Sequence, residues 1–172
     1  AWVVQKHKLG LASASISPVT LYKGTAATIT HAPPTDPDGD LVTTSYAWYL
    51  DDVLVPGATS SGWTVAGTQG SNVRGRVTLA DGRDTVVIDT AAVPISNRPP
   101  TIDTFTLPEP LLRVPAPLAS ATASDADGDT VAYEYVWTHD GVEVQRGSSP
   151  TLTATLQPGK VVTAKVVVTD GR

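Results

Sequence analysis

The sequence repeats itself once, and this repeat limits the folds that the chain can adopt. The segment Asp36-Pro37-Asp38-Gly39-Asp40 returns 89 residues later as Asp125-Ala126-Asp127-Gly128-Asp129. From there the two copies align without a gap as far as Asp81-Gly82-Arg83 and Asp170-Gly171-Arg172. Solenoid repeats are shorter, about 20–50 residues, whereas a copy of this length is the size of a small independent domain. The repeat therefore predicts two domains of one fold.

Each copy has the pattern of short β-strands between turns. Residues 42–50 alternate between a mostly apolar face and a more polar face, and residues 131–139 repeat the alternation. Trp48 and Trp137 occupy the same place on the apolar face, so we expect both to mark the core. The chain has 14 Gly and 14 Pro, and no stretch keeps a helical apolar period. These features predict an all-β protein.

The domain boundaries follow from the strands and from a proline pair. Residues 84–89 give the first copy a closing strand after its terminal Asp-Gly-Arg. Pro99 and Pro100 then cannot continue a hydrogen-bonded ladder, and we expect them to form a short, stiff linker. We predict an N-terminal strand at residues 1–8, a first domain at 9–97 and a second domain at 98–172.

Together the D-x-D-G-D, Y-x-W, D-G and terminal D-G-R motifs resemble tandem bacterial immunoglobulin-like repeats of the PKD and cadherin-like kind. The resemblance covers both copies. It implies two tandem Ig-like β-sandwich domains, located outside the cell or on a bacterial cell surface. Repeats of this kind serve as spacers, adhesin stalks, fibre subunits and accessory modules of large secreted proteins.

The repeated acidic loops predict a calcium site in each copy. Three carboxylates within five residues, on a loop that glycine bends, suit the oxygen-only coordination of Ca²⁺. In an Ig-like sandwich the D-x-D-G-D loop and the D-G-R loop lie at the same end. The candidate ligands are Asp36, Asp38, Asp40 and Asp81, with Asp125, Asp127, Asp129 and Asp170. The alternative is that these residues only form turns, because Asp and Gly are ordinary turn formers and Arg83 and Arg172 can pair with the carboxylates.

The two copies differ at their ends. The second copy reaches Arg172 at the point where the closing strand of the first copy begins, so we expect its sheet to have an open edge. The first residues look like a spare strand, with Trp2, Val3, Val4 and Gln5 as its centre. One interpretation is head-to-tail self-association, in which each subunit donates this strand to a neighbour and builds a fibre. A second is that the sequence is a window from a longer array of repeats, and a third is that the strand pairs within its own chain or in some other way.

Composition and motifs argue against other classes of function. The net charge is −5 and the 12 Lys and Arg are scattered, which is unlike a nucleic-acid-binding surface. No apolar run is long enough to cross a membrane as a helix. His7, His31 and His139 lack metal-ligand spacing, and no nucleophile elbow or phosphate-binding loop is present, so we do not expect an enzyme.

A carbohydrate-binding or adhesive module is the alternative from another class. It would bind a surface glycan through exposed aromatic side chains. The candidates are Tyr22 and Tyr49, which are not repeated in the second copy.

Overall fold

The computed structural model describes residues 6–107 and 116–172, and it contains strands and no helix within them. All pairings between named strands are antiparallel. The prediction of an all-β protein is confirmed. The chain divides into two compact units, Ala1–Asn97 (unit 1) and Arg98–Arg172 (unit 2), and each is described by itself.

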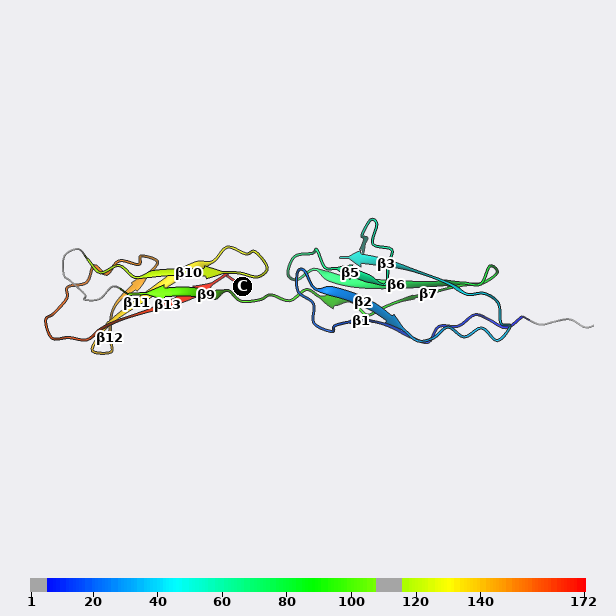
Figure 1. Ribbon diagram of the computed structural model, residues 1–172, viewed down its shortest axis with the longest axis horizontal. Coiled ribbons are helices and arrows are strands. Elements are labelled where there is room, and N and C mark those ends of the chain that lie inside the picture. Colours follow the sequence, from blue (N-terminus) through cyan, green and yellow to red (C-terminus); the bar gives the residue numbers. More distant parts are fainter. Residues whose placement is uncertain (1–5, 108–115) are drawn as a thin grey trace, which may run out of the picture. The chain divides into compact units, whose positions relative to one another are not determined.

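Unit 1 contains two sheets. Figure 1 labels β1, β2 and β5, which form the first sheet in this order, and β3, β6 and β7 of the second sheet. The full order of the second sheet is β4-β3-β6-β7, and β8 also pairs with β6. The strands are β1 (Ala14–Ser17), β2 (Ala26–His31), β3 (Thr43–Leu50), β4 (Val53–Leu54), β5 (Gly62–Thr64), β6 (Asn72–Ala80), β7 (Thr85–Asp89) and β8 (Val93–Pro94).

The core of unit 1 lies between these sheets, because alternate residues of each strand point inward. Ile29 of β2 belongs to the same buried cluster as Trp48 of β3 and Val77 of β6. Trp48 is 0% exposed, and its indole N–H donates to the carbonyl oxygen of Ser60 at 3.0 Å. The ring of Trp63 lies against the ring of Trp48, with 5.6 Å between the ring centroids. Unit 1 is therefore a β-sandwich built around a buried, hydrogen-bonded tryptophan.

A tight turn follows the tryptophan strand in both units. Asp51 and Asp52 have φ angles of 49° and 64°, and Asp140 has a φ of 46° before Gly141 at 81°. Positive φ at both central positions is the requirement of the hairpin turns that match strand twist. The Asp51 carboxylate also accepts the backbone N–H of Asn72 at 2.8 Å, which joins the turn to the start of β6.

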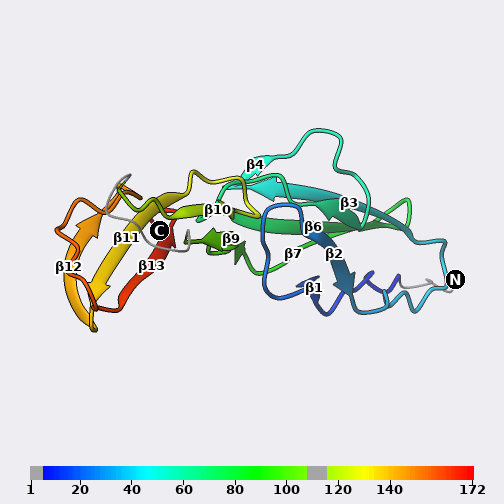
Figure 2. The same cartoon turned by 60° about the vertical axis from the view of Figure 1, so that its left-hand side comes forward.

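Unit 2 repeats the tryptophan strand and its neighbours. It pairs β9 with β10 in one sheet and orders the other sheet β12-β11-β13, as Figure 2 shows. Trp137 of β11 is 0% exposed and packs in a cluster with Leu152 and Val166. The strands are β9 (Thr101–Thr106), β10 (Ser120–Ser124), β11 (Ala132–His139), β12 (Val142–Gly147) and β13 (Val162–Thr169).

The two units differ at the strand beside the tryptophan strand. In unit 1, β6 pairs with β3 on one edge and with β7 and β8 on the other. Its counterpart β13 pairs only with β11 among the described residues. Val77 and Leu79 of β6 are 0% exposed, whereas the aligned Val166 is 7% exposed and Val168 is half-buried. The core beside β13 is therefore less completely covered.

Gly75 of β6 gives a test of the packing in unit 1. A Cβ at this position would lie 2.6 Å from Cδ1 and Cγ1 of Ile29, so the two sheets have no room for it. We expect Gly75→Ala to destabilise unit 1 by roughly 1–3 kcal/mol through overpacking. Urea unfolding followed by tryptophan fluorescence measures this. The matched control is Ala164→Gly at the aligned position of β13, which should cost only about 1 kcal/mol. A Gly75→Ala variant as stable as the wild type would contradict this packing.

Candidate functional site

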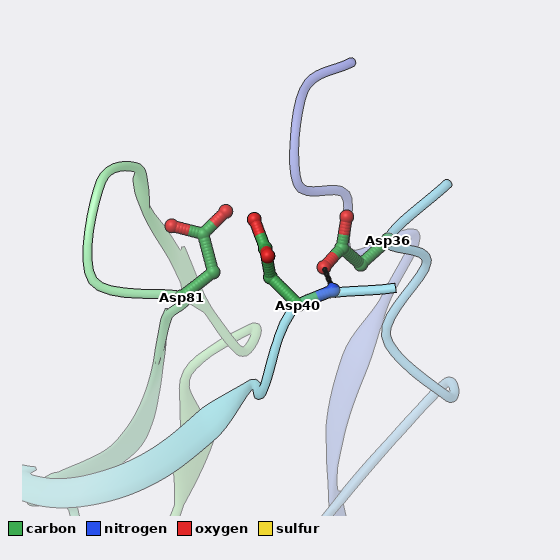
Figure 3. Close-up of side chains that lie close together, drawn as sticks. All are labelled: Asp36, Asp40 and Asp81. Atoms are coloured by element: carbon green, nitrogen blue, oxygen red, sulfur yellow. Dashed lines mark hydrogen bonds between the residues drawn. The ribbon is translucent and has the colours of Figure 1, made fainter. Parts of the chain in front are cut away.

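The acidic loops of unit 1 meet at one end of the sandwich. Asp36 and Asp40 lie on the loop between β2 and β3, and Asp81 lies on the turn between β6 and β7. The pairing of Thr43 with Ala80 joins the bases of these loops. One carboxylate oxygen from each of the three aspartates lies within 4.8 Å of the others, and Figure 3 shows Asp40 between Asp36 and Asp81. We call these three residues the acidic triad.

Two members of the acidic triad cap their own turns. Asp36 accepts the backbone N–H of Asp40 at 2.7 Å and that of Asp38 at 3.1 Å. Asp81 accepts the N–H groups of Asp84 and Arg83 at 2.6 and 2.8 Å. These two bonds, with a third from Lys6, lower the pKa of Asp81 to about 2. The carboxylates of Asp36 and Asp81 therefore stabilise their own loops by accepting backbone hydrogen bonds.

Lys6 provides the cation of this site. Its ammonium nitrogen lies 3.0 Å from Asp81, 3.9 Å from Asp40 and 3.9 Å from Asp84. The Asp81 side chain is 0% exposed, so its negative charge is buried beside this ammonium. A metal ion held by the acidic triad would have to displace Lys6, because both would be attracted by the same carboxylates.

Asp38, the middle aspartate of the loop, contacts the chain that enters unit 1. Its Oδ2 accepts the backbone N–H of His7 at 2.8 Å, and its Oδ1 lies 2.8 Å from Nδ1 of the same histidine. The hydrogen bonds from the side chain and the backbone of His7 lower the pKa of Asp38. Asp38 therefore points toward the entering chain and is not part of the acidic triad.

The loop of unit 2 makes the same two kinds of contact. Asp125 accepts the N–H groups of Asp127 and Asp129 at 2.8 and 3.1 Å, which caps the loop. Asp127 accepts the backbone N–H of Arg98 at 2.7 Å and its guanidinium at 2.8 Å. The first aspartate of each motif therefore shapes the loop, and the second binds the residue that enters the unit.

The third aspartate of each motif has a basic neighbour of its own. In unit 2, Asp129 lies 3.4 Å from the guanidinium of Arg172, and the backbone N–H of Arg172 donates to Asp170 at 3.0 Å.

Of the eight predicted calcium ligands, the structure gathers Asp36, Asp40 and Asp81. Within the described part of unit 2, no three carboxylates approach one another in this way.

Sequence reasoning missed the basic residues of the site. Lys6 and His7 fall in the predicted N-terminal strand and Arg98 begins the predicted second domain, but none of them was predicted to contact the acidic loops. His7 precedes its aspartate by 31 positions and Arg98 precedes its aspartate by 29, so the gapless repeat does not align them. The signal available in the sequence is a basic residue next to the predicted start of each domain.

The remaining predicted residues lie elsewhere. The assembly strand Trp2, Val3, Val4 and Gln5 falls outside the described residues. Tyr22 is half-buried, and the ring of Tyr49 lies under the guanidinium groups of Arg74 and Arg76, at 4.2 and 5.1 Å.

The histidines do not gather into a site. His7 contacts Asp38, and Nε2 of His31 lies 3.1 Å from the hydroxyl of Tyr46. His139 is half-buried at the end of β11.

No family model and no curated protein sequence matches this chain. The likeness to tandem bacterial Ig-like repeats therefore depends on the motifs alone. Among the residues that the structure describes, no helix is long and apolar enough to span a membrane.

The lowered pKa of Asp81 predicts a pH-dependent contribution to stability. A carboxylate whose pKa falls from 3.8 to about 2 on folding stabilises the folded state above pH 3.8. This contribution is lost as the pH falls toward 2. We expect Asp81→Asn to be less stable than the wild type at pH 6 and the difference to disappear near pH 2. Urea unfolding over this pH range measures it.

Asp52→Asn is the control for this experiment, because the Asp52 side chain is 86% exposed. It should change stability little at either pH. A deficit of Asp81→Asn that persists unchanged at pH 2 would contradict the assigned role of the Asp81 carboxylate.

Calcium binding by the acidic triad stays a prediction, and Lys6 gives its test. Removing the ammonium removes a competing cation, so Lys6→Ala should bind Ca²⁺ roughly 10-fold more tightly than the wild type. Isothermal titration calorimetry measures the affinity. Lys8→Ala changes the same charge at an exposed residue two positions away and should leave the affinity unchanged. Absence of binding in all three proteins would refute the calcium site.

Proposed function

We propose that this chain is a structural subunit of an extracellular fibre or stalk, whose Ig-like units join head to tail by donor-strand addition. The observation that carries the proposal is the edge of β13. Among the described residues this edge has no strand beside it, whereas the equivalent edge of β6 is paired along most of its length.

An added strand would supply what this edge lacks. The backbone N–H and C=O groups along an edge strand are a template for another extended segment. Every second side chain of the added strand would also point toward the core and cover Val166 and Val168. Main-chain hydrogen bonds would give affinity, and the inward side chains would give specificity.

The first residues of a second copy are the proposed donor. In this arrangement Ala1 of the donor follows Asp170-Gly171-Arg172 of the acceptor. This matches unit 1, where Asp81-Gly82-Arg83 comes before β7. In that alignment Val3 takes the place of Val86, and Val4 takes the place of Val87. Val86 packs against the core of unit 1, whereas Val87 is 51% exposed. The donor is therefore expected to insert Val3 and to expose Val4.

The path of the chain through unit 1 also suits a stalk. The chain enters beside Asp81, which follows the last residue of β6. It leaves through Ser96, just after β8, which pairs with the first residues of β6. The nine residues of β6 span roughly 30 Å, so the entry and exit lie at opposite ends of the strand. Units with this layout extend an array by their own length.

Calcium has a limited part in this proposal. The acidic triad is the candidate for an ion that would stabilise unit 1, and unit 2 offers no equivalent group among its described residues. Strand addition at β13 does not depend on the ion. The carbohydrate-binding alternative is less well supported, because the Tyr49 ring that a sugar would stack on is covered by Arg74.

The alternation of the donor strand makes the proposal testable. We expect Val3→Asp to abolish assembly, because it places a carboxylate where Val86 packs in unit 1. Val4→Asp, at the outward position, should assemble like the wild type. Sedimentation velocity over a range of protein concentrations measures the size of the assemblies.

Val4→Asp is the matched control, since it makes the same chemical change one residue away. If the wild type is monomeric at all concentrations, self-assembly by this chain is ruled out. If both variants assemble normally, the polymer forms through another surface.

A further inference from the structure

The residues on either side of Asn97 in the linker both form hydrogen bonds, one within unit 1 and the other within unit 2. Within unit 1, the backbone N–H of Ser96 donates to the carbonyl oxygen of Leu21 at 2.7 Å, next to the bridge between Leu21 and Ile95. Within unit 2, the backbone N–H of Arg98 donates to Asp127 at 2.7 Å. Asn97 is the one residue between Ser96, which bonds within unit 1, and Arg98, which bonds within unit 2.

Asp127 holds Arg98 with both of its oxygens. Oδ2 accepts the backbone N–H, and Oδ1 accepts the guanidinium at 2.8 Å. The Asp127 side chain is 7% exposed and the Arg98 side chain 34% exposed. A carboxylate buried to this extent needs partners for its oxygens, and hydrogen bonds in which at least one group is ionised are the strong ones. Arg98 supplies two such bonds to Asp127.

The loop holds Asp127 in position for this contact. Asp125 accepts the backbone N–H of Asp127 at 2.8 Å and that of Asp129 at 3.1 Å, so the loop is fixed by its own first aspartate. After Arg98, Pro99 and Pro100 have a restricted φ angle and lead directly into β9. The chain is therefore restrained from Arg98 to the first strand of unit 2.

The same arrangement occurs in unit 1. Asp38 accepts the backbone N–H of His7 at 2.8 Å and lies 2.8 Å from the ring nitrogen of the same residue. The two contacts form although the sequence separation differs, 31 residues in unit 1 and 29 in unit 2. In both units the loop accepts the backbone N–H of one residue and also contacts the basic side chain of that residue. The repetition indicates a specific binding geometry.

We infer that the middle aspartate of each D-x-D-G-D loop is a socket for the chain that enters the unit. The ligand of the socket is a backbone N–H together with the basic side chain of the same residue. In unit 2 the socket locks the linker through contacts that the protein itself makes. This role of Asp127 goes beyond fibre assembly and does not depend on it.

The experiment uses the full chain with Thr30→Cys and Thr122→Cys, which add one spin label to each unit. The chain has no cysteine of its own, so labelling is specific. Double electron–electron resonance then measures the distribution of distances between the two labels. The samples are diluted with unlabelled protein so that labels on different molecules do not contribute. Asp127→Ala is compared with Asp38→Ala, which removes the equivalent carboxylate from the loop of unit 1.

We expect Asp127→Ala to broaden the distance distribution at least about twofold. Its Arg98 amide should exchange with solvent roughly 10- to 100-fold faster, as the loss of a charge-assisted hydrogen bond implies. Asp38→Ala should accelerate exchange of the His7 amide but leave the distribution as narrow as in the wild type. The wild-type distribution should be the same in calcium and in EDTA.

Two results would overturn the inference. One is an unchanged distribution in Asp127→Ala, and the other is equal broadening in Asp38→Ala. Amide exchange in β11 and β13 shows whether unit 2 remains folded. If Asp127→Ala unfolds it, Asp127→Asn replaces that variant, because it removes the charge and keeps one oxygen acceptor. An unchanged distribution in a folded Asp127→Asn variant counts against the lock in the same way.

Discussion

The antiparallel pairing of the tryptophan strand with its long neighbour is the interaction on which the rest of the structure depends. In unit 1 it joins β3 to β6, and in unit 2 it joins β11 to β13. The register turns Trp48 and Trp137 inward, where each is fully buried. It also brings the D-x-D-G-D loop and the D-G-R loop to one end and the Asp51 or Asp140 turn to the other. The acidic end of each unit is thus a consequence of strand register.

The elements that the sequence predicts well are those that a local period or a turn motif specifies. The alternation around Trp48 and the closing strand at residues 84–89 both arise from neighbouring residues, and they appear in the structure as β3 and β7. The contacts of Lys6 with the acidic loops join residues as many as 75 positions apart. No period encodes such a contact, and the different spacing of His7 and Arg98 conceals it from self-comparison.

The sequence predicts calcium because three carboxylates lie within five residues, and this cluster is repeated in both copies. The structure gives a different account of that repetition. Asp36 and Asp125 cap their loops, and Asp38 and Asp127 bind the entering chain. The third aspartate faces Lys6 in unit 1 and Arg172 in unit 2. Each position therefore has a use that the chain itself supplies, and a calcium ion bound in unit 1 would have to compete with Lys6.

In the proposed array, the entry of unit 2 and the open edge of β13 would have complementary roles. Asp127 holds the entry of the chain into unit 2, and among the described residues the outer edge of β13 has no neighbouring strand. A flexible linker would allow an added neighbour to swing, because each freely rotating residue widens the range of orientations. Strand addition alone would therefore give a chain of loosely jointed units. A carboxylate lock at each entry would turn the same connections into a stiffer array, and it would do so at any calcium concentration.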